Sequence, residues 1–104
     1  MVVFLIDNKA NVDFLSSEGT ALMAATVKGN FKMTELLLQN GANPDLTNEA
    51  GISALMYAVQ FKNISIIKLL LQHNANKLLL DKEGRSAFEY AVFTKNEEII
   101  NLLK

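Results

Sequence analysis

The sequence contains no cysteine and a single histidine, His73. The absence of cysteine excludes disulfides, thiolate nucleophiles and the cysteine-ligated zinc and iron–sulfur sites. Ten basic residues stand against eleven acidic ones, which gives a formal net charge of −1. Without a surplus of positive charge the chain has no field that would hold a phosphate backbone, so we expect no nucleic-acid partner.

Long hydrophobic runs are also missing. The longest uninterrupted apolar run covers residues 1–6, whereas a membrane-spanning helix needs about 20 apolar residues. The run has neither a basic leader nor a small-residue cleavage site, so we expect no secretory signal and no membrane insertion. Half of the 104 residues are apolar and 20% are charged, which is typical of one packed domain. We therefore expect a soluble intracellular protein, located in the cytoplasm, with a single domain over residues 1–104.

Two signatures repeat along the chain at a regular interval. Residues 35–43 (ELLLQNGAN) return as residues 68–76 (KLLLQHNAN), and residues 3–11 (VFLIDNKAN) precede the first of these by 32 positions. A second signature begins at Gly19, Gly51 and Gly84 and interleaves with the first. A regular interval of this length is typical of a solenoid, in which each unit is too small to bury its own apolar face and must stack on its neighbours.

Each unit is predicted to contain two short helices joined by a turn. Thr20, Ser53 and Ser86 supply hydroxyls that can cap the first helix of each unit, and Glu89 completes a capping box with Ser86. Turn formers cluster between the units, at residues 41–45. The following apolar residues recur at helical intervals in the three units: Leu22, Ala25, Met33, Leu36 and Leu37; Leu55, Ala58, Ile66, Leu69 and Leu70; Phe88, Ala91, Ile99, Leu102 and Leu103. These features predict an all-α helix-turn-helix solenoid.

The two interleaved signatures resemble those of the ankyrin repeat family, and the resemblance covers essentially the whole chain. It implies an ankyrin-like solenoid with short β-turn finger loops. It also implies a division into the C-terminal half of a repeat at 1–15, repeats at 16–48 and 49–81, and a truncated repeat at 82–104. The family proline is replaced by Ala21, Ala54 and Ala87, and the family histidine by Met23, Met56 and Glu89. Because family members use that histidine to bond neighbouring loops, we expect looser loops here.

The glycine that follows the first helix of an ankyrin repeat is kept as Gly29 and replaced by Lys62 and Lys95. If the two lysines keep the left-handed backbone of the glycine, each costs about 1 kcal/mol. Asn74 replaces a later glycine, and asparagine tolerates this backbone region better. We therefore expect Lys62 and Lys95 to be sites of strain.

Residues that could carry out catalysis are few. His73 has no visible acid–base partner, and we interpret it as an exposed residue at a helix end. Glu97 and Glu98 point to different faces of a helix and fit its first turn, where negative charge is favoured. The polar residues that follow Asp45 lack the spacing of a calcium loop. We expect no enzyme, no cofactor and no metal site.

The resemblance implies a surface that binds another protein. In ankyrin-like arrays the finger loops and the inner face of each first helix line a concave strip that contacts the partner. By aligned position, this strip holds Glu18, Val27, Lys28, Glu49, Ile52, Tyr57, Gln60, Phe61, Lys82, Glu83, Arg85, Tyr90 and Phe93. Aromatic residues and arginine are the usual energetic anchors of an interface. The phenylalanines could equally fold back over neighbouring helices, and the tyrosines could fill grooves between units.

We expect a protein-interaction module without catalysis. An alternative is a structural or regulatory segment of a larger protein, such as a channel, kinase or ligase adaptor, that contacts its own chain or further repeats. Met1 aligns with Met33, and no polar helix follows Leu103, so both ends of the solenoid are predicted to be uncapped. We interpret the chain as a piece of a longer array, with self-association of the uncapped ends as the alternative.

Overall fold

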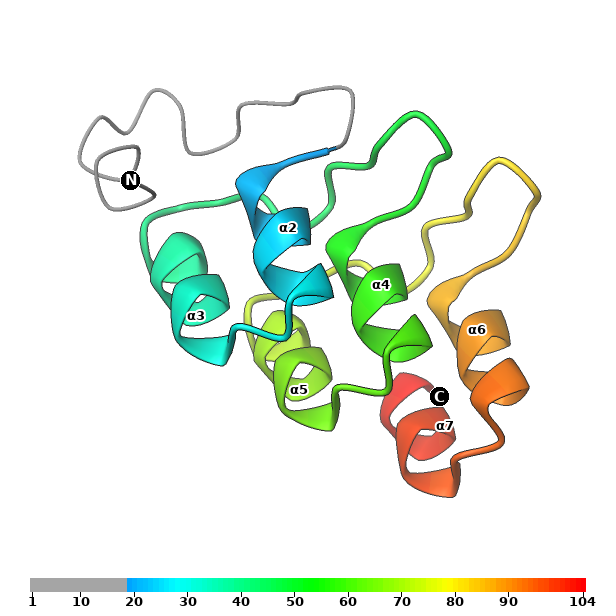
Figure 1. Ribbon diagram of the computed structural model, residues 1–104. Helices are drawn as coiled ribbons and strands as arrows, with labels where there is room; N and C mark the ends of the chain where they lie inside the picture. The colour runs from blue at the N-terminus through cyan, green and yellow to red at the C-terminus, as the bar shows by residue number, and fades with distance from the viewer. Residues whose placement is uncertain (1–18) are drawn as a thin grey trace.

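The computed structural model describes residues 19–104, so the expected half repeat at residues 1–15 and the expected contact residue Glu18 lie outside it. The described residues form three antiparallel helix pairs and no strand, which confirms the all-α helix-turn-helix prediction (Figure 1). The pairs are α2 (Ala21–Val27) with α3 (Phe31–Gln39), α4 (Ala54–Gln60) with α5 (Ile64–Gln72), and α6 (Ala87–Thr94) with α7 (Glu97–Leu103).

Side-chain caps fix where each helix begins. The hydroxyls of Thr20, Ser53 and Ser86 accept bonds from the backbone N–H three residues on, as the sequence predicted. Ser86 and Glu89 form the expected capping box. The second helix of each pair has a cap that the sequence analysis overlooked. Asparagine at 30, 63 and 96 accepts the same kind of bond, and its recurrence at the same place in every unit was a visible signal.

The turn inside each helix pair uses a left-handed residue. This residue is Gly29 (φ 70°) in the first pair, Lys62 (φ 58°) in the second and Lys95 (φ 59°) in the third. Asn74 also adopts this conformation after α5 (φ 66°). The expected left-handed lysines are therefore present, and each first helix ends after seven or eight residues.

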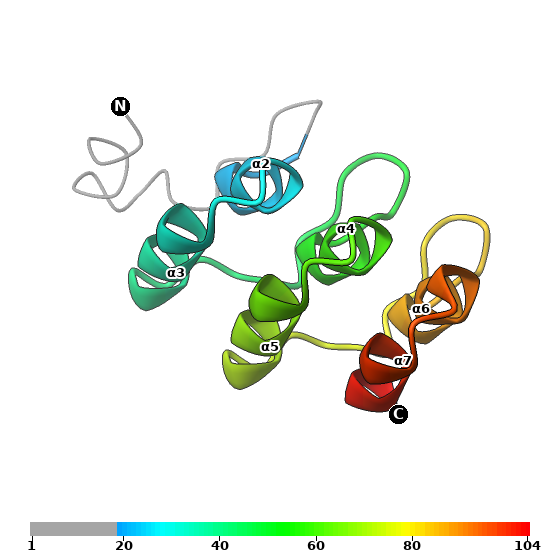
Figure 2. The ribbon, with the colours of Figure 1, turned by 60° about the horizontal axis from the view of Figure 1, so that its bottom comes forward.

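The helices lie in two layers, with α2, α4 and α6 in one and α3, α5 and α7 in the other (Figure 2). Neighbouring pairs pack through the first layer, where α4 contacts both α2 and α6. Ala25, Ala58 and Ala91 are all buried, so small side chains let these helices approach closely, as predicted. Fully buried Ile66 and Leu70 of α5 occupy the middle of the core, and burying each such side chain stabilises the fold by about 1.5–3 kcal/mol.

Finger loops connect one pair to the next and project on one side of the first layer (Figure 1). An antiparallel bridge between Thr47 and Ser53 closes the first described finger. Neighbouring loops are joined by two bonds. The N–H of Lys82 donates to the carbonyl of Ala50 (3.1 Å), and the N–H of Asn76 donates to the Asp45 carboxylate (2.7 Å). These two bonds connect the loops, although the histidine that bonds neighbouring loops in the family is replaced here. No helix within residues 19–104 is long and apolar enough to cross a membrane.

Candidate functional site

The three helices α2, α4 and α6 separate the predicted contact residues into two groups. One group lies on the fingers, before each helix, and the other lies where each helix meets the turn to its partner (Figure 1). A helix of seven or eight residues is about 11 Å long, so the two groups stand about that far apart. We call these two regions the finger end and the turn end.

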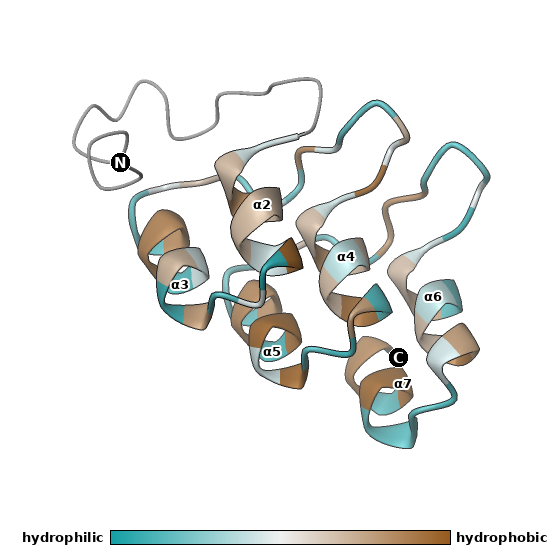
Figure 3. Cartoon of the chain, in the orientation of Figure 1, coloured by the Kyte–Doolittle hydropathy of each residue, from teal (hydrophilic) through white to brown (hydrophobic). Residues whose placement is uncertain are grey.

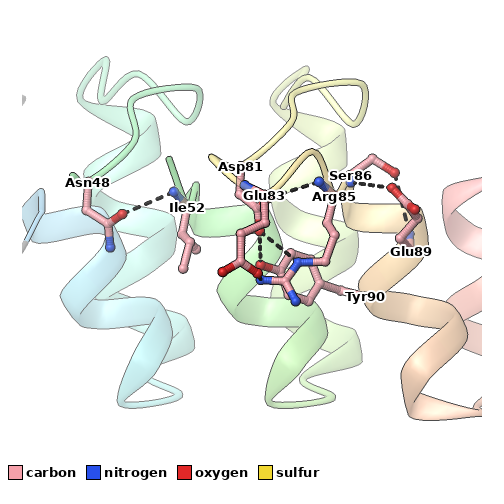
Figure 4. A network of polar contacts seen from close by, with 8 residues as sticks. All are labelled: Asn48, Ile52, Asp81, Glu83, Arg85, Ser86, Glu89 and Tyr90. Carbon is pink, nitrogen blue, oxygen red and sulfur yellow. Dashed lines mark hydrogen bonds and ion pairs between the residues drawn. The ribbon is translucent and has the colours of Figure 1, made fainter. Parts of the chain in front are cut away.

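The finger end of the third unit is organised by Asp81 (Figure 4). Its buried carboxylate accepts bonds from the N–H groups of Glu83 and Arg85 (both 2.9 Å), from Nε of Arg85 (3.2 Å) and from the hydroxyl of Tyr90. The Tyr90 bond, followed by the backbone bond from Arg85, lowers the pKa of Asp81 from 3.8 to about 2. The carboxylate therefore stays ionised and fixes the loop to the following helix.

Arg85 is tied into the same cluster. Its Nη2 lies 2.5 Å from Glu83 Oε1, and its guanidinium sits 5.2 Å from the centroid of the Tyr90 ring. Burial and the bond to Asp81 raise the pKa of Tyr90, while Arg85 and Gln60 oppose that rise. Gln60 belongs to α4 of the preceding unit.

The second unit repeats the arrangement with an amide in place of the carboxylate. Asn48 Oδ1 accepts bonds from the N–H groups of Ala50 (3.0 Å) and Ile52 (3.1 Å), and Asn48 Nδ2 donates to the hydroxyl of Tyr57 (2.7 Å). No prediction from the sequence included this arrangement. The sequence contains a signal for it in both units. A short polar residue, Asn48 or Asp81, lies three positions before the finger glycine and nine positions before a tyrosine.

The tyrosines and phenylalanines thus separate into two classes. Tyr90 is buried, Tyr57 is partly buried, and both hydroxyls are bonded internally, as expected for side chains that fill grooves between units. Phe61 and Phe93 are 55% and 72% exposed, so they do not fold back over neighbouring helices. The tyrosines therefore pack inside the protein, whereas the phenylalanines are exposed to solvent.

The turn end is apolar and basic. Val27, Phe61 and Phe93 are exposed where the first helices meet their turns. In Figure 3, hydrophobic and hydrophilic segments lie next to one another where α2 and α4 approach their turns. Lys28, Lys62 and Lys95 accompany them, one in each turn, and all three are exposed. In residues 19–104 no carboxylate lies within ion-pair distance of these lysines.

The remaining predicted residues lie mostly at the finger end. Glu49, Lys82 and Glu83 are exposed, whereas Ile52 and Arg85 are partly buried. Gln60 is exposed at the end of α4. The described predicted residues therefore lie on the finger loops and the first helices, separated along the helices, with the two tyrosines between the groups.

Little in the described chain resembles a catalytic centre. His73 caps the C-terminus of α5 and is partly buried, where the sequence analysis expected an exposed residue at a helix end. Glu97 and Glu98 lie in the first turn of α7, as predicted. Residues 19–104 contain no group of three histidine, aspartate or glutamate side chains placed to hold a metal ion.

Comparison with known proteins agrees with this geometry. The family described as "Ankyrin repeats (3 copies)" matches residues 33–104, which include α4 to α7 and most of α3. No curated protein matches the chain. The match extends over more than half of the sequence and includes both complete fingers described above.

Proposed function

Because the chain belongs to the ankyrin repeat family, whose repeats are protein-protein interaction modules, we propose that it binds another protein through the surface formed by its finger loops and first helices. The family consists of non-catalytic interaction modules. The finer assignment, to particular residues of this chain, rests on how the two ends of the first helices are built.

The observation that carries the proposal is the exposure of Phe61 and Phe93. The exposed part of each phenylalanine is apolar area in water, so covering it with a partner is favourable by about 25 cal/mol per Å². The two residues belong to successive units, and each lies where the first helix of its unit meets the turn to the second. Large aromatic side chains in such positions dominate the binding free energy of many interfaces.

The finger end supplies a polar boundary to this surface. Glu49, Lys82 and Glu83 are exposed near the finger tips, and they present charges of both signs. Polar residues around an apolar centre are typical of protein interfaces. We assign orientation and specificity to these charges, because solvent-exposed ion pairs each contribute only about 0–1 kcal/mol.

A matched pair of variants tests the proposal. Leu78 and Leu80 are 77% and 59% exposed, close to the values for Phe93 and Phe61. They precede the turn that the Asp81 N–H closes on the Arg85 carbonyl at the finger tip, and they belong to neither group of predicted contact residues. Binders would be selected against the chain from a displayed peptide library and assayed on F61S/F93S and on L78S/L80S. We expect most binders to lose affinity on the phenylalanine variant and to retain it on the leucine variant, with unchanged helical circular dichroism for both. Binders that retain full affinity for F61S/F93S would place the interface elsewhere.

A second candidate function is a stacking role, in which α6 and α7 contact further repeats of the same kind. Val92 is 48% exposed, whereas Val59, the residue at the same position one unit earlier, is completely buried, and its helix α4 packs against α6. Self-association through this face would appear as a concentration-dependent mass in sedimentation equilibrium, and V92E would abolish it. A constant monomer mass at every concentration would remove the self-association form of this role.

A further inference from the structure

The turn end carries exposed apolar and basic side chains in every unit, although Phe61 lies one position later in its unit than Val27 and Phe93 do in theirs. We define the turn strip as Val27, Lys28, Phe61, Lys62, Phe93 and Lys95. These residues lie at the α2–α3, α4–α5 and α6–α7 turns, which form a row along one edge of the molecule (Figure 1). Each turn thus presents at least one exposed apolar side chain and at least one exposed ammonium group, and Phe31 and Lys32 add to the first turn.

The charges of the strip are available to a partner. None of the three lysines lies in an ion pair within residues 19–104, whereas Lys68 on α5 pairs with Glu98 and Arg85 pairs with Asp81 and Glu83. Glu97, in the first turn of α7, is the exposed carboxylate nearest in sequence to the strip. The strip therefore has an excess of positive charge on a chain whose net charge is −1.

The backbone gives a second, independent observation. Lys62 and Lys95 adopt the left-handed conformation in which the first unit has Gly29. A glycine would fit these turns with less strain, because it has no Cβ to clash with the carbonyl oxygen. Strained residues of this kind cluster at binding sites, where the surrounding structure holds them in place. Lysine at these two positions indicates a role for the side chain that outweighs the strain.

The spacing between successive turns along the strip is close to the spacing of residues on one face of an α-helix. Packed helices lie about 8–10 Å apart, so equivalent points on successive units are separated by about that distance. An α-helix rises about 1.5 Å per residue, and residues seven positions apart on one face lie about 10.5 Å apart. A helix laid along the strip can thus place one apolar residue over each unit.

From the charge and the spacing together, we propose that the turn strip binds an acidic amphipathic helix of another protein, which lies across the three turns. Its apolar residues, repeating once in every heptad, cover Phe61 and Phe93. Its carboxylates face Lys28, Lys62 and Lys95. This assignment rests on the proposed function and adds the chemistry of the partner and the half of the surface that it contacts.

The decisive test uses a synthetic helical peptide that is three heptads long, with one leucine in each heptad and glutamates on both sides of each leucine. One control peptide has lysine at every glutamate position, and the other has the same composition with the leucines moved to different faces. Fluorescence anisotropy at low and high salt measures binding to the full chain. We expect the acidic amphipathic peptide to bind best, and salt to weaken it, because exposed charge pairs are screened. Equal binding of the three peptides would overturn the proposal.

Variants of the strip separate binding from folding. In K62G/K95G the strain is relieved and two charges are lost, so we expect the melting temperature to rise while affinity for the acidic peptide falls about fivefold. Loss of stability cannot explain weaker binding by a more stable protein. F61S/F93S should lower the affinity for the acidic peptide about tenfold or more, and L78S/L80S should leave that affinity unchanged. Unchanged affinity in K62G/K95G would overturn the assignment of the lysines.

The outcomes also distinguish this proposal from the broader one. If library binders depend on Phe61 and Phe93 but the acidic peptide does not bind, the proposed function stands and the partner chemistry is wrong. If library binders ignore both phenylalanines, the proposed function itself fails. Binding of phosphatidylserine vesicles in preference to the peptide would overturn the choice of a protein helix in favour of a membrane surface.

Discussion

Replacing Lys62 or Lys95 by glycine should make the protein more stable. Both residues have φ near +58° in turns where Gly29 serves the same purpose. A side chain in this region costs about 1–2 kcal/mol, and glycine adds back about 0.5–1 kcal/mol through its greater freedom in the unfolded chain. The difference is a gain of about 0.5–1 kcal/mol in the free energy of unfolding for each substitution.

Thermal unfolding followed by circular dichroism can resolve this gain. For a domain of about 100 residues, 1 kcal/mol corresponds to about 4–8 °C in Tm, so each substitution should raise Tm by about 2–8 °C. The two lysines belong to different units, and distant sites are additive within about 0.5 kcal/mol. The double variant should therefore show roughly the sum of the two shifts.

Two control variants isolate the cause. Lys62→Ala removes the same charge but keeps a Cβ in the left-handed region, so its Tm should stay close to that of the parent. Lys28→Gly acts at the exposed C-cap of α2, one position before Gly29, where φ is −77°. It relieves no strain and should lower Tm slightly. Unchanged or lower Tm values for both Lys62→Gly and Lys95→Gly would refute the reasoning, and a gain in Lys62→Ala equal to that in Lys62→Gly would assign the effect to charge.

Three further predictions concern the fingers. Gly51→Ala should destabilise more than Gly84→Ala in urea denaturation, because both have φ near +80° but a Cβ at Gly51 would lie 2.9 Å from the backbone N of Lys82, and one at Gly84 meets nothing within 4 Å. Tyr90→Phe should cost about 1–2 kcal/mol in the same assay, since it leaves the Asp81 carboxylate without one of its donors. Because the folded pKa of Asp81, about 2, lies below its ordinary value of 3.8, its ionisation stabilises the fold above about pH 4, and this contribution is lost as the pH falls toward 2. An acid titration of stability should accordingly fall more steeply for the parent than for Asp81→Asn.

The repeat made most of the fold predictable from the sequence. The caps Ser53 and Ser86, the left-handed Lys62 and the buried Ala58 all follow from a local pattern that recurs in every unit. Local rules suffice in a solenoid because each unit contacts only its neighbours. Very little depends on residues that are distant in the sequence.

The candidate site was less predictable, because the alignment gave positions and not the environment of each side chain. Tyr57 and Phe61 both belong to α4 and its cap, yet the first bonds to Asn48 while the second points into water. Tyr57 is held by Asn48, which lies nine positions earlier in the chain and outside the helix. The spacing of apolar residues within a helix does not predict such a partner. The nine-residue spacing of Asp81 and Tyr90 recurs in the sequence, but only the geometry of the loop shows that the carboxylate reaches the hydroxyl.

The two ends of the first helices differ in what a partner must displace. At the finger end, the guanidinium of Arg85 already bonds Asp81 and Glu83, so a ligand that recruits it has to break these pairs and gains little. At the turn end, Phe61 and Phe93 contact mainly water, and covering them releases that water without loss of an internal bond. Net binding free energy per residue should therefore be larger at the turn end. The fingers, fixed by their internal bonds, would then serve to hold the neighbouring units in register so that the two phenylalanines stay one unit apart.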